Sequence, residues 1–175
     1  MGDRRFFSKM AIVTMDINLE QLFNNIIPPS DYKHRNGFSN AVIIDRLDAA
    51  TRELIEDKLI DEISGGSNDA LIVETLAYLK SDKSLPLLYE LLETRPYPIY
   101  RLVMATFIYE INKDPNLIDI AIAESGNITN KWDLINIFYY LSKFNNVKTN
   151  EVIGNYINDK DFLISYNAKR FWIKP

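Results

Sequence analysis

The stretch DALIVETLAYLKSDKSLPLLYELLE, residues 69–93, contains two amphipathic helical patterns separated by a short polar break. Apolar residues recur every three or four positions from Leu71 to Leu79, which is the spacing of one face of a helix. Asn68 or Asp69 is placed to cap this helix, because a short polar side chain accepts hydrogen bonds from free backbone amides. Pro86 falls in the first turn of the second helix, where its missing amide costs little. The stretch therefore predicts a helical hairpin.

A shift of the sequence by 31 residues aligns this hairpin with two later segments of the chain. One apolar column contains Leu76, Phe107 and Phe138, and an aromatic column contains Tyr78, Tyr109, Tyr140 and Phe171. The polar breaks KSDKS, NKDPN and SKFNN also fall at similar places in the units. A fixed period of this length is typical of arrays in which each hairpin buries its apolar face against its neighbours. We expect the aromatic column to pack between repeats, the alternative being a ladder that stacks bases or peptide groups.

The pattern extends in both directions from the clear hairpins. Residues 38–66 read as a degenerate first hairpin ended by Gly65 and Gly66, and a lone helix is expected around Phe162 to Trp172. Before the array, INLEQLFNNIIPPS predicts a short helix that starts at Asn18 and stops at Pro28. We therefore expect one domain overall, with an N-terminal segment containing one short helix over residues 1–37 and a repeat array over residues 38–175.

The segment YPIYRLVMATFIYEINKDPNLIDIAIAE, residues 97–124, resembles a HEAT-like repeat. It shares with that family the Tyr100-Arg101 start, the small Ala105 in the first helix, and the Asp114-Pro115 break before Leu117. The hairpin over residues 131–157 departs from the pattern, because it lacks the Asp-Pro break and has Gly154 inside its second helix. The resemblance covers roughly residues 38–172. It implies an all-α, right-handed superhelical solenoid of antiparallel helix pairs, of armadillo type, and says little about function.

The composition excludes several kinds of site. The chain has no cysteine, so disulfides, thiolate zinc sites and cysteine nucleophiles are ruled out. His34 is the only histidine, and its surroundings SDYKHRNG predict a solvated loop residue. We expect no catalytic residue set, no metal and no cofactor.

The start of the chain was tested for an export signal. Arg4 and Arg5 resemble a twin-arginine motif, but the apolar stretch from Met10 to Met15 is shorter than such a signal needs. No other run approaches the roughly 20 apolar residues of a membrane span. These features predict a cytoplasmic protein without a membrane partner.

The net charge of −4 is concentrated in the middle of the chain, where residues 41–99 carry six Lys or Arg and twelve Asp or Glu. Such a surface repels phosphate backbones and favours basic partners, so we expect a basic protein partner and no nucleic acid. Second helices line the concave side of HEAT-like arrays. There the apolar stripes leave five carboxylates outside: Glu90, Glu93, Asp119, Glu124 and Glu151. They are spread over three repeats, which argues against a metal site and leaves either a partner-binding acidic face or a merely solvated one.

Three functions remain compatible with the sequence. The first is a non-enzymatic interaction scaffold or adaptor, of which immunity proteins that neutralise cationic toxins are one instance. The second follows from a resemblance to HEAT-like DNA glycosylases that excise alkylated bases, for which Trp132 and Asp133 supply an aromatic ring and an aspartate. The third is a structural module that stacks on copies of itself. The basic and aromatic residues from Lys169 to Trp172 suggest either a cap on the array or a single-strand binding site, and we expect the cap.

Overall fold

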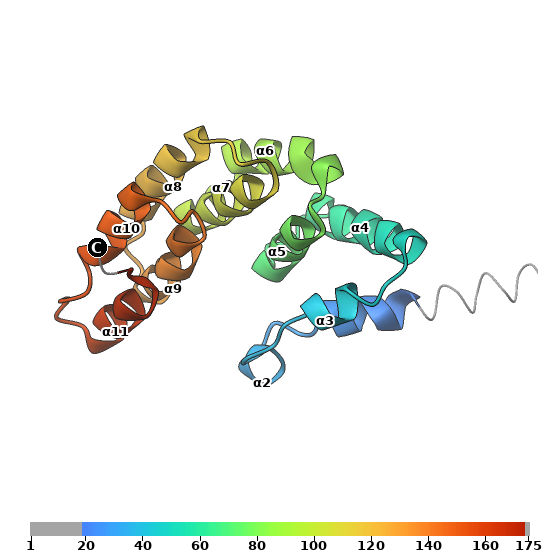
Figure 1. The fold of residues 1–175 in the computed structure, drawn as a ribbon, viewed down its shortest axis with the longest axis horizontal. Coiled ribbons are helices and arrows are strands. Elements are labelled where there is room, and N and C mark those ends of the chain that lie inside the picture. Colours follow the sequence, from blue (N-terminus) through green and yellow to red (C-terminus); the bar gives the residue numbers. More distant parts are fainter. Residues whose placement is uncertain (1–18, 174–175) are drawn as a thin grey trace, which may run out of the picture. The chain divides into compact units, whose positions relative to one another are not determined.

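The computed structural model describes residues 19–173, in which every regular element is a helix (Figure 1). No strand is present in this part of the chain, so the all-α prediction is confirmed. The residues that partly resemble an export signal, and the predicted start of the first helix at Asn18, lie outside the described residues. The chain divides into two compact units, the first ending at Gly65 and the second beginning at Gly66. The predicted boundary at residue 37 thus lies inside the first unit.

The first unit is built from one long helix and three shorter helical segments. Its elements are residues 19–26, α2 (Tyr32–Arg35), α3 (Ala41–Ile44) and α4 (Ala49–Ser64). One face of α4 buries Ile55, Leu59 and Ile63, which recur every four residues. Asp48 caps α4 by accepting a 2.8 Å hydrogen bond from the amide of Thr51. The end of α4 at Gly65 confirms the predicted glycine stop.

The second unit contains seven α-helices and one short 3-10 helix. They are α5 (Ala70–Leu79), η1 (Asp82–Ser84), α6 (Leu85–Thr94), α7 (Pro98–Asn112), α8 (Asn116–Gly126), α9 (Lys131–Ser142), α10 (Val147–Gly154) and α11 (Phe162–Phe171). The carboxylate of Asp69 accepts a 3.0 Å hydrogen bond from the amide of Leu71, which confirms one of the two predicted caps. Pro86 lies in the first turn of α6, also as predicted.

The period of 31 residues is visible in the helix boundaries. The helices α6, α8 and α10 begin at residues 85, 116 and 147, which are 31 residues apart. Leu76, Phe107 and Phe138 are each fully buried, one on α5, one on α7 and one on α9. The predicted burial of these three residues is therefore confirmed.

The helices of the second unit pack in two rows (Figure 1). In one row α5 contacts α7, α7 contacts α9, and α9 contacts α11. In the other row α8 contacts α10. Between the two rows, α7 packs against both α6 and α8. This places α7 among four neighbouring helices, which explains why the seven consecutive residues 102–108 are all buried.

Three members of the aromatic column pack against other rings. Tyr109 lies 4.7 Å from Phe144 between ring centroids, Tyr140 lies 6.1 Å from Phe107, and Phe171 lies 5.9 Å from Tyr139. Edge-on and tilted contacts at these distances are favourable between aromatic rings. Tyr78, by contrast, is exposed. Packing against another ring is thus shown for Tyr109, Tyr140 and Phe171.

The chain after α11 folds back onto α10. The side-chain amide of Asn150 donates to the carbonyl of Ile173 at 2.7 Å, and its oxygen accepts from the amide of Ile173 at 2.8 Å. A Cβ atom at residue 154 would lie 3.1 Å from Nε1 of Trp172. Gly154, which departs from the repeat pattern, therefore leaves room for the indole of Trp172.

Candidate partner-binding surface

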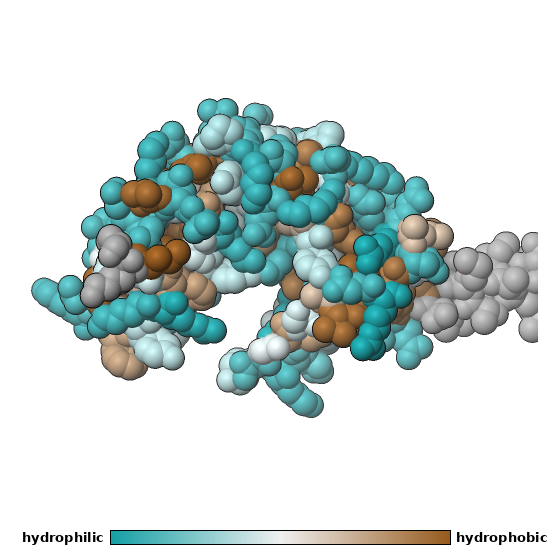
Figure 2. Space-filling view, in the orientation of Figure 1, coloured by the Kyte–Doolittle hydropathy of each residue, from teal (hydrophilic) through white to brown (hydrophobic). Residues whose placement is uncertain are grey.

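Two of the five predicted carboxylates lie on α6. This helix buries Leu88 and Leu92, so Glu90 and Glu93 fall on its solvent side and are exposed. Neither forms an ion pair with another described residue. On the face in view, the surface over α6 and α8 is mainly hydrophilic, with isolated hydrophobic patches (Figure 2). The carboxylates of α6 are available to a partner.

Glu124 at the end of α8 is engaged inside the protein, contrary to the prediction that it is exposed. Its carboxylate lies 2.7 Å from the guanidinium of Arg101, and only 16% of the glutamate side chain is exposed. The hydrogen bond to Glu124 raises the pKa of Arg101 above its ordinary value. Arg101 also donates to the carbonyl of Arg95 at 2.8 Å, so the pair ties the start of α7 to the end of α8. Glu124 therefore does not belong to a free acidic face.

Asp119 is exposed, but its charge is compensated. The ammonium of Lys148 on α10 lies 2.8 Å from its carboxylate, and both side chains are more than half exposed. An exposed pair of this kind contributes little to stability, about 0–1 kcal/mol. It does show that the second helices α8 and α10 bring their outer residues together. The predicted face is thus less acidic here than the sequence implied.

Glu151 on α10 is exposed and forms no ion pair with a described residue. It also lines a cavity beside the segment that follows α11. Of the five predicted residues, Glu90, Glu93 and Glu151 remain as free carboxylates, whereas Asp119 and Glu124 are paired.

A polar cluster that the sequence did not predict joins α5, α7 and α9. The hydroxyl of Tyr139 donates to the carboxylate of Glu74, and the ammonium of Lys143 lies 3.7 Å from Glu74 and 3.8 Å from Glu110. Burial, followed by the bond to Glu74, raises the pKa of Tyr139 far above its ordinary value, so the phenol stays a proton donor. All four groups are satisfied by each other. The cluster therefore links α5, α7 and α9, which are neighbours in one row of the second unit.

Asp133 lines a second cavity of about 400 Å³ at the starts of α7 and α9. Tyr97 and Tyr100 also line it, with ring centroids 6.0 Å apart in an edge-on arrangement. Trp132, which the glycosylase reading pairs with Asp133, is 63% exposed and is not part of the cavity wall. None of the described residues that line this cavity is a lysine or arginine.

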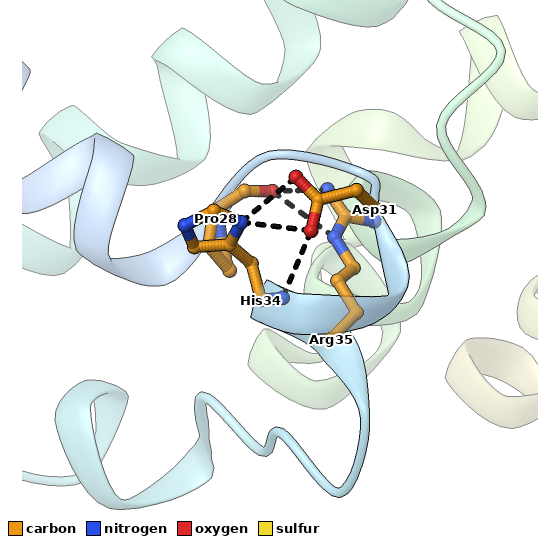
Figure 3. Close-up of polar contacts among 4 residues, drawn as sticks. All are labelled: Pro28, Asp31, His34 and Arg35. Carbon is orange, nitrogen blue, oxygen red and sulfur yellow. Dashed lines mark hydrogen bonds and ion pairs between the residues drawn. The ribbon is translucent and has the colours of Figure 1, made fainter.

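His34 lies in the one-turn helix α2 and not in the predicted loop (Figure 3). Its Nδ1 is 2.8 Å from both carboxylate oxygens of Asp31, and Asp31 also caps the helix by accepting from the His34 amide at 3.0 Å. These bonds to His34 lower the pKa of Asp31. Arg35 anchors the same turn by donating to the carbonyl of Pro28 at 3.0 Å. The histidine and aspartate thus stabilise a turn that the sequence did not reveal.

Residues 19–173 hold no group of three or more His, Asp or Glu side chains placed to bind a metal ion. Within the same residues, no helix combines the length and the apolar character that crossing a membrane requires. In comparisons with protein-family models, with curated proteins and with solved structures, nothing matches the chain.

Proposed function

We propose that the chain is a HEAT-like, armadillo-type repeat protein that acts as a non-enzymatic scaffold or adaptor for a basic protein partner. In this proposal the second unit is a right-handed solenoid of antiparallel helix pairs. The 31-residue spacing of α6, α8 and α10 and the contacts of α5, α7, α9 and α11 along one row support it. An immunity protein that neutralises a cationic toxin is one function of this class.

The observation that carries the proposal is the contrast among the carboxylates of the second helices. Glu124 and Asp119 are paired within the protein, whereas Glu90, Glu93 and Glu151 are exposed and unpaired. Unpaired surface carboxylates raise the association rate of a cationic partner, because charges of opposite sign steer the encounter. We therefore assign these three residues to partner binding.

The test is a charge reversal with a matched control. Replacing Glu90, Glu93 and Glu151 by Lys should leave the protein folded, because all three side chains are exposed. The control replaces three exposed carboxylates of α4, namely Glu53, Asp61 and Glu62, by Lys. Both variants and the unmodified chain are used as bait in cell lysate at low and high salt. The association rate of each captured protein with each of the three baits is then measured.

Basic proteins held by the unmodified chain and by the α4 control, but lost by the reversed variant, support the proposal. Their association should also depend less on salt in the reversed variant, because fewer charges steer it. The same proteins bound at the same rate by all three baits would show that the carboxylates only solvate the surface.

A second candidate function is the excision of alkylated bases. The position of Asp133 favours this function. The aspartate stands in a cavity with two tyrosines, and an enzyme of this kind needs a carboxylate and aromatic rings around the base. Release of a methylated base from duplex DNA, and its loss in Asp133→Asn, would establish it. The absence of a basic residue in the cavity wall ranks it below the scaffold, because DNA binding depends on neutralising phosphates.

A further inference from the structure

A cavity of about 360 Å³ lies against α10. Its wall includes the end of α9, the loop before α10, residues along the whole of α10, and the chain at and after the end of α11. Its apolar lining comes from Val147, Ile153, Phe171 and Ile173. The volume is in the lower part of the roughly 300–1,000 Å³ that ligand pockets occupy, which is room for one or two side chains.

Most polar side chains of the wall already have partners inside the protein. Ser142 donates to the carbonyl of Tyr139 at 2.7 Å, and Thr149 donates to the carbonyl of Asn146 at 3.0 Å. The side chain of Asn146 accepts from the amide of Lys148 at 2.9 Å. Asn150 uses both ends of its amide on the backbone of Ile173. These groups shape the cavity but are not free to recognise a ligand.

The polar lining side chains left without a hydrogen bond to a described residue are Asn145 and Glu151. Among the described residues of the cavity wall, Glu151 is also the only charged one. The last residues of α9 and α11, Ser142 and Phe171, line the cavity too, and a helix C-terminus carries a partial negative charge. The start of α10 carries the opposite partial charge, but the side chain of Asn146 caps it.

Among the cations adjacent in sequence to lining residues, Lys148 is paired with Asp119, and the guanidinium carbon of Arg170 lies 5.4 Å from the centroid of the Phe171 ring. Arg170 is exposed and does not line the cavity. Within residues 19–173, the wall therefore combines apolar contact surface with one carboxylate that has no counter-ion. A lysine or arginine side chain matches this combination, because its stem is apolar and its head is charged.

We infer that this cavity receives one basic side chain of the partner, with its stem against Val147, Ile153 and Ile173 and its charged head on Glu151. An adjacent apolar side chain of the same partner segment fills the remaining volume. The inference rests on the proposed function, because that function identifies the partner as a protein. The inference adds the chemistry of one contact with this partner.

The inference is tested with small probes on the whole chain. Backbone amide shifts of the nitrogen-15-labelled protein are followed by NMR during titration with N-acetyl-valyl-lysine amide. Two matched probes replace lysine with norleucine, which lacks the ammonium, or with glutamate. The lysine probe should shift amides from Asn145 to Ile153 and bind about tenfold more tightly than the norleucine probe, since a hydrogen bond to a charged group has about this effect.

Variants then identify the recognising group. Glu151→Gln should weaken the lysine probe about tenfold and leave the norleucine probe unchanged. The matched control Glu62→Gln removes an exposed carboxylate of α4 and should change neither. Equal binding of lysine and norleucine probes, tighter binding of the glutamate probe, or no shift with any probe would each overturn the inference.

The outcome is separable from that of the proposed function. If Glu90→Lys with Glu93→Lys slows a basic partner while the lysine probe does not bind, the cavity inference fails and the scaffold stands. If the lysine probe binds at Glu151 while charge reversal changes no protein association, the scaffold proposal fails and the cavity stands.

Discussion

The helices α7 and α10 belong to the same unit but use their surfaces differently. α7 contacts α5, α6, α8 and α9 and buries seven consecutive residues, 102–108. α10 is about half as long and buries only Thr149 and Ile153. The rest of its surface includes the side-chain amide of Asn150, which holds Ile173, and the exposed carboxylate of Glu151, which lines the cavity. The comparison shows that packing is concentrated in α7, whereas α10 leaves the surface on which we propose recognition.

The largest expected effect is the loss of a core ring from α7. Phe107→Ala should lower the free energy of unfolding by about 3–5 kcal/mol, the usual cost of deleting a buried aromatic ring. Phe162→Ala removes a ring of the same kind that is 76% exposed on α11, and should change stability by about 0.5 kcal/mol or less. Denaturant unfolding of the two variants measures the difference. A loss below about 1 kcal/mol for Phe107→Ala would contradict its place in the repeat core.

The next largest effect is expected at the ion pair that links the start of α7 to the end of α8. Glu124→Gln removes the charge that Arg101 faces, in a site where both side chains are less than a quarter exposed. We expect a loss of about 1–2 kcal/mol in unfolding free energy, somewhat less than a fully buried charged hydrogen bond. Asp119→Asn is the control, because its pair with Lys148 is mostly exposed and should contribute about 0–1 kcal/mol. Equal losses in both variants would mean that partial burial of the Glu124 pair has no consequence.

The apolar core of the second unit was predictable from the sequence, but the polar contacts between its helix ends were not. Leu76, Phe107 and Phe138 could be aligned because burial of a helix face leaves a periodic apolar pattern. The pair of Arg101 with Glu124 leaves no such pattern, since it depends on which helix ends meet. A signal was nevertheless present: a basic residue in the first turn of α7 and an acidic residue in the last turn of α8 meet when consecutive helices run antiparallel.

The sequence predicted which residue types form the candidate site, but not which contacts they make. The apolar stripe of α6 placed Glu90 and Glu93 on its exposed side, which the structure confirms. The compensation of Asp119 by Lys148 requires knowing that α8 and α10 are neighbours. The cavity beside Glu151 depends on Ile173 and Phe171, whose return onto α10 has no periodic signature. Sequence pattern thus reveals buried faces, whereas contacts between helix ends and irregular segments need coordinates.

A smaller effect should appear in the pH dependence of the start of α11. Asp161 caps α11 and lies 2.5 Å from the ammonium of Lys131; this hydrogen bond and those to the amides of Leu163 and Ile164 lower its pKa. A carboxylate with a lowered folded pKa stabilises the protein above its unfolded pKa, near 3.9, and this contribution is lost as pH falls through the folded pKa. As the pH falls through the folded pKa, the hydrogen bonds from the amides at the start of α11 to Asp161 should therefore weaken. An acid titration followed by NMR measures this change. In Lys131→Met the same change should begin at higher pH, and an unchanged midpoint would contradict the role of the ion pair.

The smallest effect on stability, and the sharpest test of α10, is expected from Gly154→Ala. The new Cβ atom would meet Trp172 at 3.1 Å from Nε1 and 3.6 Å from Cδ1, so the indole must shift. Alanine also favours the helix by up to about 1 kcal/mol over glycine, which offsets the crowding and leaves a net change of about 0.5 kcal/mol or less. Gly126→Ala is the matched control, because Gly126 ends α8 as Gly154 ends α10 but has open space at its Cβ position. In a Trp132→Phe background that isolates Trp172, Gly154→Ala should shift the indole NMR resonance and the fluorescence maximum, and Gly126→Ala should shift neither. An unchanged Trp172 signal in Gly154→Ala would mean that the indole does not lie on α10, and that the chain after α11 does not close this side of the cavity.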